Sequence, residues 1–254
     1  MSNNNNWVST TDNAIGQQLL EGGKALMKNI YNLDPNGTDY QPGSYTKPDN
    51  FSSLTDYEYH VDVDTNMYWT EQLSWECVPA GKQTGTVSSI QTGSVNNPDS
   101  KIVSTDCSGF ITGLFTYCNN VGGVDTKFGD WQLKRTVPQA KDFFKAFGKK
   151  DFDSLNIDQI EPGDLIAFTY HENKHKDSGH IMLIVATQSV ETNRTDVIVM
   201  DVTKSPHTSD TRGDSAGLGM GIGQLFLDTS GVLHFYWGTD NGTDEYPVAL
   251  GRAL

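Results

Sequence analysis

The chain is poor in cysteine and in positive charge. Its 254 residues include three cysteines, which are too few and too widely spaced for a disulfide framework and contain no CxxC pair of the kind that binds zinc. Lysine and arginine number 18 against 32 aspartates and glutamates, so the formal net charge is -14. A surface of this sign repels nucleic-acid phosphates and anionic membranes, and we expect neither as a partner.

Long hydrophobic runs are also missing. No apolar stretch approaches the roughly 20 residues that cross a bilayer. The N-terminus, residues 1–6, has neither the basic nor the apolar region of a secretory signal. We therefore expect a soluble chain that is made in the cytoplasm and has no transmembrane segment. Non-classical export and the oligomeric state are left open.

Hydrophobic periodicity predicts three helices. Residues 12–32, 107–118 and 137–147 place apolar side chains three and four positions apart, which is the repeat of one helix face. Asp12 is expected to cap the first helix. Residues 79–105, in contrast, are rich in Gly, Ser and Thr, and we expect loops with short strands there.

Short β-branched runs separated by turn residues predict strands in the second half of the chain. They cover residues 164–169, 180–186, 196–202, 223–228 and 232–237. Helices followed by such a meander predict an α+β domain with an antiparallel sheet of about five strands. We expect this domain to span residues 101–254, with residues 1–100 as an N-terminal extension that packs on or caps it, or the whole chain to form one compact domain. The glycine-rich run 217–223 is expected to be a tight loop.

The segment Asp106-Cys107-Ser108-Gly109 opens the second predicted helix. Backbone N–H groups are unpaired in the first turn of a helix and the helix dipole is positive there, and both effects favour a thiolate at Cys107. Ser108 and Gly109 are small enough to let a carbonyl approach, and N–H groups of the first turn can stabilise an oxyanion. Cys107 is therefore a candidate nucleophile, with Ser108 beside it in the oxyanion and substrate-binding region.

His180 begins an apolar run that predicts a central strand, and Asp201 lies on the next predicted strand. A symmetric hairpin over residues 180–202 places Asp201 directly opposite His180. The imidazole can take a proton from the thiol and return it to a leaving group, while the carboxylate orients the ring. A shift of one residue in the pairing would turn Asp201 to the other face of the sheet.

Three motifs in this order resemble the NlpC-type cell-wall peptidases, a family of papain-like cysteine peptidases. They are Asp106-Cys107-Ser108-Gly109, Pro162-Gly163-Asp164 entering an apolar strand, and Gly179-His180. The resemblance covers about residues 100–203, with Asp201 in the third polar position, where the family commonly has histidine. It implies a papain-like NlpC-type fold, with N-terminal helices packed on the sheet, and a bacterial thiol hydrolase that cleaves peptide or amide bonds, often in peptidoglycan stem peptides.

Two more residues are assigned to the expected site, and other functions compete with hydrolysis. His207 and Arg212, with Asp210 between them, are candidates to line the cleft and bind a substrate carboxylate, or else form a solvated loop. We expect no cofactor and no metal, because the histidines at 171 and 175 lie in a polar, lysine-containing loop. Acyl transfer to an amine or lipid, amidase action on another substrate, and an inactive binding protein remain as competing functions.

Overall fold

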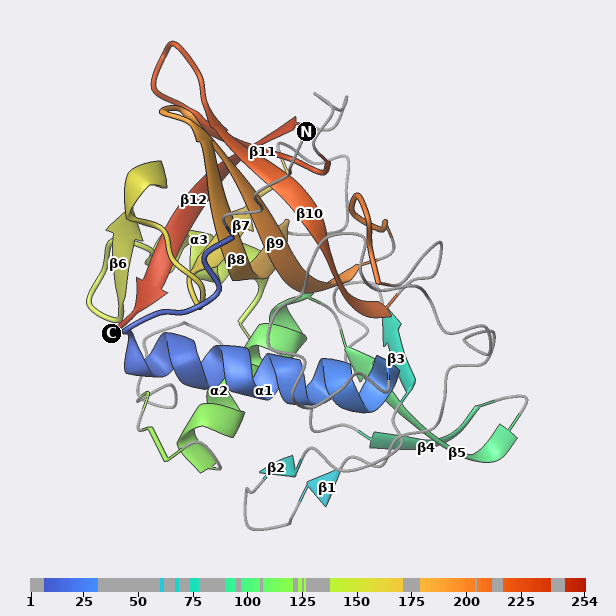
Figure 1. Cartoon of the computed structure of the whole chain (residues 1–254). Helices are drawn as coiled ribbons and strands as arrows, with labels where there is room; N and C mark the ends of the chain where they lie inside the picture. Colours follow the sequence, from blue (N-terminus) through green and yellow to red (C-terminus); the bar gives the residue numbers. More distant parts are fainter. Residues whose placement is uncertain are drawn as a thin grey trace.

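The chain folds around a closed antiparallel barrel (Figure 1). The computed structural model describes residues 7–31, 107–120, 123, 124, 126, 138–170, 179–203, 205–211, 217–238 and 245–254, together with the backbone of five short strands between residues 60 and 105. Six strands form the barrel in the order β11-β10-β9-β8-β7-β12, and β12 pairs with β11 to close it. They are β7 (Leu165–Phe168), β8 (His180–Glu191), β9 (Arg194–Thr203), β10 (Gly217–Leu227), β11 (Leu233–Tyr236) and β12 (Glu245–Ala253).

The expectation of a papain-like fold with about five strands in an open sheet is therefore wrong. The strand that closes the barrel, β12, lies in a segment for which the sequence predicted no strand. Its antiparallel partners are β7 on one side and β11 on the other, through pairs such as Val248 with Phe168 and Phe235 with Tyr246. A further strand, β6 (Phe152–Leu155), pairs with the other end of β12. The glycine-rich run 217–223 is part of β10 rather than a tight loop.

The predicted helices are present, and they lie outside the barrel. They are α1 (Ala14–Tyr31), α2 (Cys107–Asn120) and α3 (Ala140–Ala146), and a short 3-10 turn, η2 (Ile157–Gln159), precedes β7. The remaining strands are β1 (His60–Val61), β2 (Met67–Tyr68), β3 (Ser74–Cys77), β4 (Ile90–Ser94) and β5 (Asn97–Thr105). Since β5 runs across residue 100, it joins the two segments that the sequence analysis separated there.

Helix α1 packs against one end of the barrel, as Figure 1 shows. Its cap is Asn13 rather than Asp12, because the Asn13 side-chain oxygen accepts a hydrogen bond from the Gly16 N–H at 2.8 Å. Gly23 lets the helix approach β9 closely, since a Cβ there would lie 2.7 Å from the Met200 sulfur. No helix in the part of the chain that the structure describes is both long enough and apolar enough to span a membrane.

Two buried clusters divide the interior. The first fills the barrel and takes side chains from all six strands, among them Phe168, Met182, Val199, Leu225, Phe235 and Leu250. The second lies between the barrel wall and the helices, and includes Leu19 of α1, Phe110 and Leu114 of α2, and Ile181 and Leu183 of β8. Full burial of each large apolar side chain stabilises the fold by about 1.5–3 kcal/mol. Alternate residues of β8 and β9 thus face the helices or the inside of the barrel.

The Pro-Gly-Asp turn that precedes β7 is hydrogen-bonded to two other strands of the barrel. Gly163 N–H donates to the Ile184 carbonyl and the Asp164 carbonyl accepts from the Ile184 N–H, both at 2.8 Å. The buried Asp164 carboxylate accepts two hydrogen bonds from the Arg252 guanidinium of β12, each 2.8 Å long. Burial nevertheless raises the pKa of Asp164, because desolvation outweighs the stabilising effect of Arg252. The turn therefore ties β8 and β12 together.

Candidate active site

One carboxylate joins two histidines inside the barrel. The Nε2 atom of His180 lies 2.6 Å from Oδ2 of Asp201, and the Nε2 atom of His207 lies 3.0 Å from the same oxygen. The Asp201 and His207 side chains are fully buried, and that of His180 is 8 % exposed. Because a buried carboxylate needs donors, both rings are best placed to donate their Nε2 protons to it. The structure thus confirms the predicted contact between His180 and Asp201.

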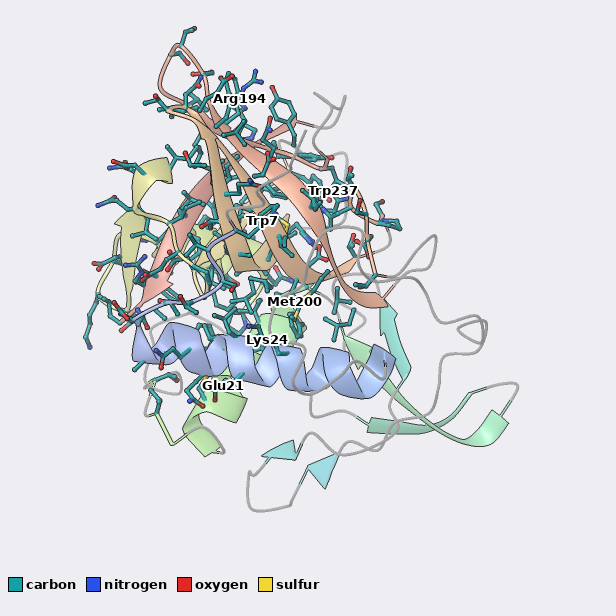
Figure 2. All side chains as sticks on the ribbon, in the orientation of Figure 1. Trp7, Glu21, Lys24, Arg194, Met200 and Trp237 are labelled. Atoms are coloured by element: carbon teal, nitrogen blue, oxygen red, sulfur yellow. The ribbon has the colours of Figure 1, made fainter. Side chains whose placement is uncertain are left out.

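This group lies at the end of the barrel that faces the helices. Figure 2 shows Met200, the residue before Asp201, beside α1, while Arg194 marks the opposite end of β9. His180 begins β8, which runs antiparallel to β9, and it therefore lies at the same end. The Trp237 ring stacks on His207 at a centroid distance of 4.3 Å and lies 5.3 Å from the His180 ring. Trp237 is half-buried, so it covers the histidines toward solvent.

The pairing of β8 with β9 differs from the predicted symmetric hairpin. Leu183 pairs with Met200, and continuing this register puts Asp201 opposite Met182, diagonal to His180. The strands run further than expected, to a two-residue turn between Glu191 and Arg194. Two bulges, which leave Val185 and Val190 as extra residues on β8, then change the register again. The net displacement is two residues, an even number, so Asp201 stays on the face that carries His180.

Gly179 allows His180 to begin its strand in this position. Its φ is +132°, and a Cβ at this residue would lie 2.0 Å from the Phe168 carbonyl oxygen. A side chain is excluded by both the backbone conformation and the space. The Gly-His pair of the sequence motif therefore has a direct structural reason: β8 can approach the end of β7 only if the residue before the histidine has no side chain.

Cys107 lies in the helical layer, outside the barrel wall. It is the first residue of α2, which packs against β8 and β9. The preceding strand, β5, pairs with β3, and β3 in turn contacts β9 and β10. Cys107 is 7 % exposed and belongs to the same buried cluster as Val202, the neighbour of Asp201. Helix α2 thus packs on the outer face of β8 and β9, whereas His180 and Asp201 point into the barrel.

The structure does not join the sulfur to the ring directly. Within the described residues no hydrogen bond links Cys107 Sγ to His180, whose Nε2 is engaged by Asp201. This arrangement leaves Nδ1 as the nitrogen of His180 that can accept a thiol proton. Hydrogen bonds of catalysis are often long before substrate is bound and tighten in the complex.

The remaining predicted site residues lie in different environments. Ser108 lies in the first turn of α2, where it is buried, and its carbonyl accepts a hydrogen bond from the Thr112 hydroxyl at 2.8 Å. Arg212 and Asp106 lie outside the described residues. His207, expected on a cleft wall, is instead buried behind Asp201. Trp237, which stacks on His207, directly follows β11, and its position could not be inferred from sequence spacing.

Cys118 provides an internal contrast to Cys107 on the same helix. Its side chain is fully buried, and burial raises the pKa of its thiol to about 12. A thiol of this kind is protonated at neutral pH and inaccessible, as expected of a packing residue. Cys118 is therefore a packing residue of the core.

The described residues contain no group of three or more His, Cys, Asp or Glu side chains arranged to hold a metal ion. His171 and His175 lie outside the described residues. Comparison of the chain with protein-family models, with curated proteins and with solved structures finds no match in any of the three.

Proposed function

We propose that this chain is a thiol hydrolase that cleaves peptide or amide bonds. Cys107 is the nucleophile, His180 the general base and then acid, and Asp201 the group that orients His180. The observation that carries the proposal is the buried 2.6 Å pair of His180 and Asp201, on two strands against which α2, the helix that begins at Cys107, also packs. An ordered imidazole–carboxylate pair can take the proton of a thiol at a helix N-terminus and so activate the sulfur for attack on a carbonyl.

The reaction proceeds in two stages. His180 Nδ1 takes the thiol proton, and the Cys107 sulfur attacks the carbonyl carbon of the substrate. The C–N bond then breaks, the imidazolium gives its proton to the departing amine, and a thioester remains on Cys107. In the second stage, His180 takes a proton from water as the oxygen attacks the thioester, and the carboxylic acid product leaves with the thiol restored. Asp201 compensates the positive charge that His180 carries between these steps.

The substrate class follows from the three sequence motifs. Their resemblance to NlpC-type cell-wall peptidases makes peptidoglycan stem peptides the first substrates to test. The acidic chain, with its net charge of -14, favours neutral or cationic parts of such a substrate over phosphate-rich ones.

Product analysis tests this function. The wild-type protein is incubated with soluble peptidoglycan fragments in ¹⁸O-water, with and without an added amine. We expect new amine ends, one ¹⁸O atom in each new carboxylate, and a thioester mass on Cys107 after rapid acid quenching. Transfer of the acyl group to the added amine in place of water would make the chain a transferase. Absence of both new amine ends and a thioester would contradict the proposal.

A further inference from the structure

His207 is held in place by a network that extends well beyond its ring. Its backbone N–H donates to the Asp210 carboxylate at 2.8 Å, and the turn is anchored to β10 by the bond from Ile222 N–H to the Thr208 carbonyl, also 2.8 Å. Ser209 adopts a φ of 52°, in the left-handed region that non-glycine residues seldom occupy. A conformation of this kind persists when its surroundings enforce it. The turn thus fixes the direction of the His207 side chain.

Glycines of β10 make the space for this turn. Leu218, Met220 and Ile222 alternate with Gly219, Gly221 and Gly223, and the three larger residues are buried toward the helical layer. A Cβ at Gly221 would lie 2.6 Å from the His207 Cβ and 2.8 Å from the Asp210 carboxylate. Gly219 pairs with Asp201 across the ladder. The glycine-rich run therefore leaves the interior face of β10 open where His207 enters.

The ring of His207 is placed to act as a neutral donor. Its Nε2 atom contacts Asp201, while Nδ1 is buried and has no hydrogen-bond partner within the described part of the chain. A proton on Nδ1 would leave a buried N–H unpaired, which is costly. The favoured state therefore has the proton on Nε2, donated to Asp201, and leaves the mobile proton of the site to His180.

We propose that His207 is a positioning residue, which holds the Asp201 carboxylate so that Asp201 in turn fixes the tautomer of His180. The inference rests on the proposed function for its catalytic meaning, but the hydrogen-bond relay itself is a property of the folded chain. His207 cannot contact substrate in this structure because its side chain is fully buried. Without its bond, the Asp201 oxygen would lose one of its two histidine donors and the carboxylate would have greater freedom to rotate.

The first test detects the hydrogen-bond relay from His207 through Asp201 to His180 without any assay of activity. Two-bond ¹H–¹⁵N spectra of histidine-labelled protein report which ring nitrogen of His180 carries the proton. We expect a single Nε2–H tautomer in the wild type, a mixture of tautomers in His207→Phe, and recovery in His207→Gln, whose amide can donate from a similar position. Gly221→Ala, which displaces the turn and keeps the histidine, should resemble His207→Phe.

A matched control comes from the half-buried pair His234 and Asp228, whose Nε2–Oδ2 distance is 3.1 Å. His234→Phe makes the same chemical change away from the site and should leave the His180 spectrum and the turnover unaltered. For the site variant, we expect kcat per folded molecule to fall by about 10- to 100-fold in His207→Phe, with KM changed less than about twofold. His207→Gln should recover most of the loss.

Two results would overturn the positioning role. One is an unchanged His180 tautomer in folded His207→Phe; the other is a lower melting temperature with unchanged kcat per folded molecule, which would make His207 a stabilising residue only. Because the tautomer is observable even in a chain with no turnover, failure of this proposal can be told apart from failure of the proposed function.

Discussion

Cys107→Ala is expected to abolish amide hydrolysis, with turnover at least about 10,000-fold below the wild type. The sulfur is the only protein atom in the proposed mechanism that bonds to the carbonyl carbon of the substrate, so its removal leaves at most the effects of binding and orientation. The fold should remain intact, because alanine is well tolerated at the start of a helix and Cys107 lies at the edge of the buried cluster. The measurement is turnover of peptidoglycan fragments, with circular dichroism to verify folding.

Cys118→Ala is the matched control, because it removes a thiol from the same helix. The side chain is fully buried, so the change leaves a small cavity and lowers stability by about 1 kcal/mol. Turnover per folded molecule should equal that of the wild type. Retention of activity by Cys107→Ala, or loss of activity by both variants to the same degree, would exclude Cys107 as the nucleophile.

Gly163→Ala is expected to cause a large loss of stability, about 3–5 kcal/mol. The residue has a φ of +96°, and a Cβ there would lie 2.4 Å from the Cα of Gly16 in α1. The Gly16 Cα belongs to the backbone and the alanine Cβ is attached directly to it, so no rotation of a side chain can relieve the contact. The substitution must displace α1 or the turn that is hydrogen-bonded to β8. Urea-induced unfolding measures the change.

Gly231→Ala separates the cost of the positive φ from the cost of the close contact with α1. Its φ is +81°, similar to that of Gly163, but a Cβ there meets no atom within 4 Å. The free energy of unfolding of Gly231→Ala should fall only by the cost of the backbone conformation, about 1–2 kcal/mol. If Gly163→Ala were no more destabilising than Gly231→Ala, the close seating of α1 on the Pro-Gly-Asp turn would be wrong.

The sequence predicted the elements that carry the site better than the way they assemble. Apolar periodicity located α2 and α3 within a few residues, and β-branched runs located β7 to β9. Strand β12 was missed because Pro247 and Gly251 interrupt its apolar pattern, although Pro247 pairs with His234 within the ladder. Closure of the barrel depends on that strand, and for this reason the predicted open sheet was wrong.

Within the site, the local sequence pattern predicted which face of a strand a residue occupies, but it did not predict which residues that side chain contacts. The His180–Asp201 contact was predicted, but from a register that two bulges and a shifted turn alter by an even number of residues. The position of His207 depends on a turn held by β10, whose alternating glycines resemble a loop in the sequence. Contacts of this kind arise from tertiary packing and have no signal in residue spacing alone.

The central claim is that Cys107 is a thiolate supported by His180, and the alkylation rate of Cys107 tests it most directly. The rate with iodoacetamide at pH 6–7 is measured by peptide mass spectrometry in the wild type and in His180→Ala, with Cys118 as the internal reference. The account predicts that Cys107 reacts at least about 100 times faster than Cys118 in the wild type and about 10 times or more slower in His180→Ala. Equal Cys107 rates in the two proteins, both matching a simple free thiol, would contradict it.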